Sequence, residues 1–94
     1  MNHQEIAKKT SSLFQEFGVN RAALFGSTAR GEQGPESDVD VLIELSEPLG
    51  LFKFAKLNYL LEDALNKKVD LVKRSALKPG FEKTILRDLV YIYG

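Results

Sequence analysis

The chain has 94 residues, enough for one apolar core, so we expect a single domain over residues 1–94. Hydrophobic residues make up 44% and charged residues 28%, a composition that excludes a disordered chain. The 13 basic and 13 acidic side chains cancel. This balance argues against a protein that binds long nucleic acid, whereas a nucleotide site needs only a local basic group.

The absence of cysteine excludes disulfides and thiolate metal sites and is compatible with a reducing compartment. No apolar run approaches the roughly 20 residues of a membrane span. The polar N-terminus, MNHQEIAKKT, lacks the apolar centre of a signal peptide. We therefore expect a cytoplasmic protein with no membrane contact.

Apolar periodicity predicts alternating helices and strands along the chain. The predicted helices are residues 2–17, one turn within 27–31, 51–66 and 79–88. The predicted strands are residues 21–25, 38–45, 68–72 and 90–93. Residues 32–37, EQGPES, are a loop by composition. This order predicts an α/β (α+β) fold, with a mixed sheet of three or four strands flanked by helices.

The predicted helix over 51–66 carries two apolar stripes. The main stripe, which should cover the sheet, contains Phe54, Leu57, Leu61, Ala64 and Leu65. The second stripe lies on another side of the helix and contains Leu51, Phe52, Ala55 and Tyr59. Two interpretations stay open for the second stripe: it packs in the core, or it forms a surface for a partner.

Two aspartates lie one residue apart at the start of the strand over 38–45. Asp38 and Asp40 share one face, with Cα atoms roughly 6.5–7 Å apart, while the apolar residues between and after them share the other. Carboxylates in this arrangement suit Mg²⁺, which is often held by one or two carboxylates plus substrate phosphates. The alternative is that Asp38 is a turn residue and Asp40 faces water.

Asp70 interrupts the otherwise apolar strand Val69-Asp70-Leu71-Val72. A lone carboxylate there is costly to bury unless it is paired or bound to metal. If the two strands are neighbours, Asp70 joins Asp38 and Asp40, and three carboxylates hold two metal ions for an in-line displacement at phosphorus. The alternative is an exposed residue on an edge strand.

A Gly-Ser turn precedes the aspartates. Gly26 lets a phosphate approach the backbone, and Ser27 offers a hydroxyl and an N–H where a helix begins. Arg30 is suited to a bidentate contact with a triphosphate. The alternatives are a simple helix cap for Ser27 and a surface ion pair for Arg30.

Together, Gly26-Ser27, ten intervening residues and Asp38-x-Asp40 resemble the G-S-x10-D-x-D signature of the DNA polymerase β-like nucleotidyltransferases. The stretches LFGSTARGE and SDVDVLIEL, with the later VDLV, resemble the minimal nucleotidyltransferase (MNT) group. The resemblance implies that the Gly-Ser pair, with Arg30, binds ATP. It also implies that Asp38 and Asp40 ligate two Mg²⁺ ions and that Asp70 is the third carboxylate, which helps activate the acceptor hydroxyl.

The resemblance further implies a partner. MNT proteins commonly pair with HEPN-domain toxins in hetero-oligomers, where the MNT member is the antitoxin of a type VII toxin–antitoxin system and transfers AMP from ATP to a tyrosine. We therefore expect a Mg²⁺-dependent protein adenylyltransferase. Two alternatives stay open: transfer to a small molecule or an RNA end, and a binding module that neutralises its partner by occlusion alone.

Overall fold

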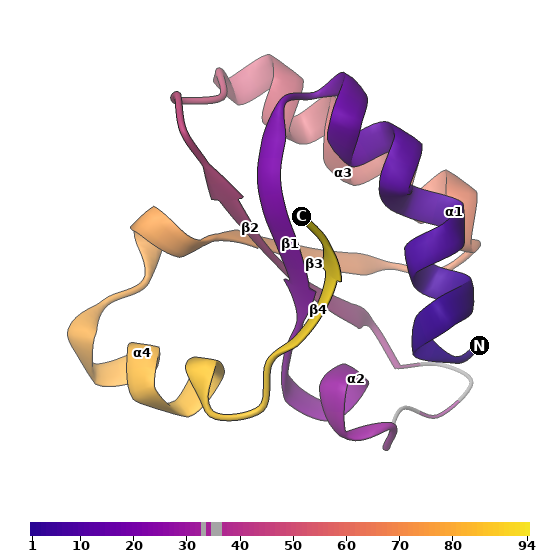
Figure 1. Ribbon diagram of the computed structural model, residues 1–94, viewed down its shortest axis with the longest axis vertical. Coiled ribbons are helices and arrows are strands. Elements are labelled where there is room, and N and C mark those ends of the chain that lie inside the picture. Colours follow the sequence, from indigo (N-terminus) through magenta and orange to yellow (C-terminus); the bar gives the residue numbers. More distant parts are fainter. Residues whose placement is uncertain (33, 35–36) are drawn as a thin grey trace.

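The structure, a computed structural model, describes residues 1–32, 34 and 37–94 and contains a four-stranded sheet with helices on both faces (Figure 1). The helices are α1 (His3–Glu16), α2 (Gly26–Arg30), α3 (Leu51–Leu65), the 3-10 turn η1 (Arg74–Ala76) and α4 (Pro79–Leu86). The strands are β1 (Val19–Leu24), β2 (Val39–Leu45), β3 (Val69–Lys73) and β4 (Val90–Tyr93). The predicted α/β class is confirmed.

The strand order in the sheet is β3-β2-β1-β4, with β3 and β4 at the edges. β1 pairs antiparallel with both β2 and β4, whereas β2 and β3 are parallel. A parallel pair needs a long crossover between its strands, and α3 supplies it. The predicted mixed sheet is thus confirmed, and the strands over 38–45 and 68–72 are indeed neighbours.

Helix α1 begins and ends as its sequence predicts. The side chain of Asn2 accepts a hydrogen bond of 2.8 Å from the backbone N–H of Glu5, which satisfies one of the free donors of the first turn. At the other end the backbone turns at Gly18, whose φ of +71° lies in the left-handed region that favours glycine.

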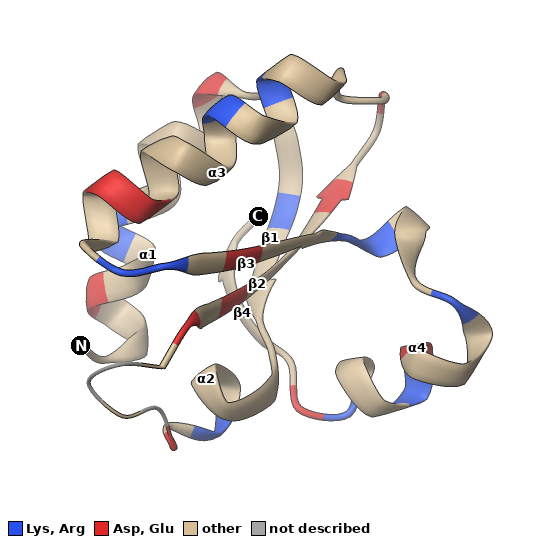
Figure 2. Ribbon diagram, turned by 180° about the vertical axis from the view of Figure 1, so that it is seen from behind, with Lys and Arg blue, Asp and Glu red and all other residues tan. Residues whose placement is uncertain are grey.

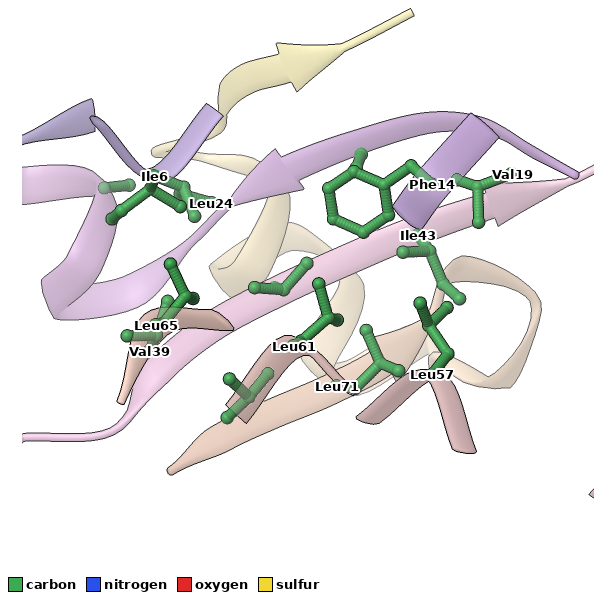
Figure 3. Packing of buried hydrophobic residues seen from close by; sticks show 14 residues of the cluster. Ile6, Phe14, Val19, Leu24, Val39, Ile43, Leu57, Leu61, Leu65 and Leu71 are labelled. Carbon is green, nitrogen blue, oxygen red and sulfur yellow. The ribbon is translucent and has the colours of Figure 1, made fainter. Parts of the chain in front are cut away.

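One face of the sheet packs against α1 and α3, which lie side by side (Figure 1). Val39, Val41 and Ile43 of β2 point into this layer, as the alternation of the strand predicts. From α3 come three fully or almost fully buried leucines: Leu57, Leu61 and Leu65 (Figure 3). The predicted main stripe of α3 is therefore the core stripe.

The second apolar stripe of α3 lies on the surface. Leu51, Phe52 and Tyr59 keep 80%, 91% and 65% of their area exposed. Of the two interpretations left open by the sequence, the core role is wrong. The helix buries its leucines against the sheet, so residues on its far side are left uncovered by the described part of the chain.

The element boundaries differ from the predicted ones by a few residues. β1 begins at Val19 rather than at Arg21, because Val19 pairs with Leu45 beyond a register shift between Val19 and Arg21. The last helix ends at Leu86 instead of residue 88. Three residues of the predicted loop over 32–37, at positions 33, 35 and 36, lie outside the described residues. Across the described chain, no helix is long and apolar enough to cross a membrane.

We expect the two stripes of α3 to differ sharply in their effect on stability. Leu61→Ala should lower the free energy of unfolding by about 2–5 kcal/mol, because it leaves a cavity in the core. Phe52→Ala on the exposed stripe should change it by less than about 0.5 kcal/mol. Urea denaturation followed by circular dichroism measures both values. Equal losses for the two variants would contradict this assignment of the faces.

Candidate active site

The pairing of β2 with β3 brings two of the predicted site residues together. In the parallel register Asp40 lies opposite Asp70, and neighbouring strands are about 4.8 Å apart. Asp38 is the residue directly before β2. Figure 2 shows acidic residues on adjacent stretches of β2 and β3, on the side of the sheet where α2 lies. The three predicted carboxylates therefore share one end of the sheet.

Gly26 brings the start of α2 close to Asp40. A Cβ atom built at Gly26 would lie 3.0 Å from Oδ2 of Asp40, and the φ of Gly26 is +59°. Both the left-handed backbone and the close carboxylate therefore require glycine at this position. The Gly-Ser turn and the aspartates, ten residues apart in sequence, are in contact.

Thr28 adds polar contacts that the sequence did not single out. Its side chain is fully buried, and its Oγ1 accepts a 2.9 Å hydrogen bond from the backbone N–H of Asp40. The same Oγ1 lies 3.4 Å from Oδ2 of Asp40 and 3.4 Å from the carbonyl oxygen of Asp38. Nothing in the local pattern signals these contacts, because they join α2 to β2 through the tertiary fold.

The site has an unbalanced negative charge. Burial raises the pKa of Asp40 above its ordinary value, and the charges of Asp70 and Asp38 raise it further. The hydrogen bonds from Thr28 act in the opposite direction and favour the ionised carboxylate, but they do not cancel the rise. A carboxylate held among like charges in this way is stabilised by a nearby cation.

The donor set fits Mg²⁺, since it consists of carboxylate oxygens on adjacent strands and contains no soft ligand. Among the described residues, however, no three carboxylate or imidazole side chains converge as a ready-made ligand group. Asp38 and Asp70 point to solvent, as like charges do when nothing between them attracts both. The residues required for a metal site are therefore adjacent but not convergent.

Arg30 is engaged in ion pairs on the surface. Its guanidinium contacts Glu32 and, at 3.2 Å, the carboxylate of Asp88, which lies between α4 and β4. Of the two alternatives raised by the sequence, the surface ion pair is the arrangement present in this structure. A role for Arg30 in binding triphosphate stays a prediction and requires these acidic partners to release it.

Neither Ser27 nor the three aspartates line the surface hollow at the start of α1. Ser27 is half-buried in the first turn of α2, which has no side-chain cap. The hollow, of about 920 Å³, lies at the start of α1, and its lining includes His3, Gly34 and Lys67. The predicted site lies instead beside the edge strand β3, where Asp70 is exposed and a large acceptor has access.

The Gly-Ser turn beside Asp40, with Asp70 opposite on the parallel neighbouring strand, is what the resemblance to the nucleotidyltransferases implies. Comparison with known families agrees. The family model of the nucleotidyltransferase domain matches residues 3–92, and the chain belongs to this family. The resemblance inferred from the sequence motif is confirmed, and the chain is an enzyme of the nucleotidyltransferase type.

Two curated relatives have similar lengths. The protein adenylyltransferase MntA of Thermococcus cleftensis is 46% identical over 80 residues, covering 85% of this chain and 81% of the relative. A Methanocaldococcus jannaschii protein, provisionally described as a protein adenylyltransferase, is 39% identical over 90 residues, covering 96% of this chain and 97% of the relative.

Solved structures have the same fold. One provisionally described as a minimal nucleotidyltransferase has a TM-score of 0.82 at 32% identity, covering 96% of this chain and 95% of the other. A toxin–antitoxin complex with AMP-PNP has a TM-score of 0.82 at 23% identity, covering 94% and 73%. A tri-AMPylated Shewanella oneidensis HEPN toxin with its MNT antitoxin has a TM-score of 0.77 at 20% identity, covering 98% and 72%. At such identities the last two show the shared fold alone.

The charge of Asp70 should destabilise the protein near neutral pH. A carboxyl with a raised pKa binds its proton more tightly in the folded state, so stability falls as the pH rises through the interval above the ordinary pKa. Asp70→Asn should therefore raise the Tm at pH 7 in metal-free buffer, and the gain should vanish at low pH, where Asp40 is neutral in both states. Differential scanning calorimetry measures this. Asp63→Asn, on the exposed side of α3, is the control, and a lower Tm for Asp70→Asn at pH 7 would contradict the proposed repulsion.

Release of Arg30 from Asp88 should strengthen ATP binding. We expect Asp88→Asn to lower the Kd for Mg-ATP by about two- to fivefold, because an exposed ion pair competes only weakly with a triphosphate. Isothermal titration calorimetry measures the Kd. The gain should disappear when Arg30→Ala is added to Asp88→Asn. If Asp88→Asn bound ATP no better than the parent protein, competition for Arg30 would be refuted.

Proposed function

We propose that this protein transfers AMP from ATP to a tyrosine hydroxyl of a HEPN-domain toxin and thereby acts as its antitoxin, in a reaction that requires Mg²⁺. The observation that carries the proposal is the placement of Asp40 opposite Asp70, with Asp38 and the Gly-Ser turn beside them. The relative named protein adenylyltransferase MntA supports the choice of a protein acceptor. The tri-AMPylated HEPN toxin in complex with an antitoxin of the same fold supports the choice of partner.

The proposed reaction is an in-line displacement at the α-phosphorus of ATP. The tyrosine oxygen forms a bond to that phosphorus, the bond to the oxygen that bridges the α- and β-phosphates breaks, and pyrophosphate leaves with the electron pair. Asp70 helps to accept the hydroxyl proton, since it is the exposed carboxylate on the edge strand. Such transfers depend mainly on positioning and on electrostatic stabilisation.

Different residues of the chain would bind the metal ions and the phosphates. Asp38, Asp40 and Asp70 would hold two Mg²⁺ ions, which supply neutralisation of the charge on the triphosphate and on the leaving group. Gly26 has no side chain to keep a phosphate from its backbone, and Ser27 would offer its hydroxyl at the start of α2.

The partner requires a surface, and α3 offers one. Leu51, Phe52 and Tyr59 form an exposed apolar stripe on the side of α3 that faces away from the sheet. Large apolar side chains gathered in this way often mark a protein-binding surface. The tyrosine of the partner would reach the aspartates from solvent, because Asp38 and Asp70 are both exposed.

The aspartates provide the main test. The double variant Asp38→Asn, Asp40→Asn should lose AMP transfer by more than about a hundredfold while it keeps the fold, because the metal ligands are gone. Transfer is measured by mass spectrometry of the purified HEPN protein from the same genome, incubated with ATP and Mg²⁺. Asp63→Asn is the control and should transfer normally. Retained transfer in the double variant would refute the metal site.

Protection of cells distinguishes catalysis from occlusion. Under the proposal, co-expression of the double variant with the toxin should no longer rescue growth, although the two proteins still co-purify. A protein that neutralises its partner by occlusion alone would protect cells without its aspartates. Normal AMP transfer to a small molecule or an RNA end, with none to the HEPN protein, would instead change the acceptor.

A further inference from the structure

We propose that Thr28 is a positioning residue, which fixes the strand end that carries Asp38 and Asp40 so that their carboxylates meet the metal ions. The proposal rests on the proposed function and adds to it a residue that acts through the aspartates. Its basis is the full burial of a polar side chain between α2 and β2, with contacts to both aspartates.

The hydroxyl of Thr28 lies at the centre of these contacts. It accepts the 2.9 Å hydrogen bond from the backbone N–H of Asp40, which holds the start of β2 against α2. It has a single proton to donate, and two acceptors lie at 3.4 Å: Oδ2 of Asp40 and the carbonyl oxygen of Asp38. The hydroxyl thus holds the backbone N–H of Asp40 and donates its one proton either to the carboxylate of Asp40 or to the carbonyl of Asp38.

Thr28 is itself held in place from a third element. Nε2 of His3, in the first turn of α1, donates to the carbonyl oxygen of Thr28 at 2.9 Å. A carbonyl oxygen can only accept, so the proton of the His3 ring lies on Nε2. The N–H of Gly31 donates to the same oxygen at 3.2 Å. A chain of hydrogen bonds therefore runs from α1 through α2 to the aspartates.

Loss of the hydroxyl would have two consequences. The N–H of Asp40 would lose its acceptor in a part-buried position, and the carboxylate would lose one of its two donors from Thr28. Outer-shell partners of metal ligands typically change metal affinity or activity by about 10–100-fold when they are removed. Thr28→Val removes the hydroxyl alone, because valine fills nearly the same volume as threonine.

The test measures metal binding directly. Mn²⁺ binding in the presence of a non-hydrolysable ATP analogue is followed by electron paramagnetic resonance for the parent protein, Thr28→Val and Thr28→Ser. We expect Thr28→Val to weaken Mn²⁺ binding by about 10–100-fold. Thr28→Ser keeps the hydroxyl and should bind within about twofold of the parent. Thr28→Ala serves as a smaller replacement if Thr28→Val does not fold, as judged by circular dichroism.

Each outcome separates the two proposals. If Thr28→Val, or Thr28→Ala in its place, binds Mn²⁺ as well as the parent, the positioning role is overturned while the proposed function stands. If Thr28→Ser is impaired as strongly as Thr28→Val, the methyl packing matters rather than the hydroxyl, and the role is also overturned. If the parent binds no more Mn²⁺ than the Asp38→Asn, Asp40→Asn variant, both the metal-dependent function and the positioning role fail.

Discussion

The parallel register of β2 and β3 is the constraint on which the rest of the site depends. It places Asp40 directly opposite Asp70, so two carboxylates lie on adjacent positions of neighbouring strands. Like charges directly opposite each other destabilise a sheet. Burial raises the pKa of Asp40, and the charge of Asp70 raises it further, so part of this rise reflects the repulsion. A site that concentrates negative charge in this way is suited to hold cations and the phosphates bound to them.

The fold offsets the repulsion between the aspartates by core packing on the other face of β2 and by local contacts around Asp40. The opposite face of β2 contributes Val39, Val41 and Ile43 to the core under α1 and α3, and this packing holds the strand in register. On the site face, Gly26 removes the side chain that would collide with Asp40, and Thr28 supplies a buried hydroxyl. The apolar layer thus provides the stability, and the polar layer uses part of it for function.

Much of this arrangement could be predicted from the sequence. The alternation in the strand over 38–45 separates apolar from acidic residues, and α3 between the two strands makes a parallel neighbour natural. The Gly-Ser turn at the right spacing before the aspartates then identifies the family. Local periodicity and one specific motif were sufficient to predict these features, because both depend on residues that lie close together in the sequence.

The remainder depends on contacts between distant residues. Thr28 follows Ser27 without any local signal, and its role is visible only once α2 lies against β2. One of the two acidic partners of Arg30, Asp88, is 58 positions away. The second stripe of α3 has the same pattern whether it is buried or exposed, and only the packing of the whole domain decides between them.

The central claim is that these aspartates direct the transfer of a nucleotidyl group and not of a terminal phosphate. The most direct measurement compares ATP labelled at the α-phosphate with ATP labelled at the γ-phosphate, using the wild-type protein, the proposed HEPN partner and Mg²⁺. We predict that the α-label appears on the partner, that the γ-label is released as pyrophosphate, and that chelation of Mg²⁺ stops both. Appearance of the γ-label on the partner, or transfer of the α-label without divalent metal, would contradict the account.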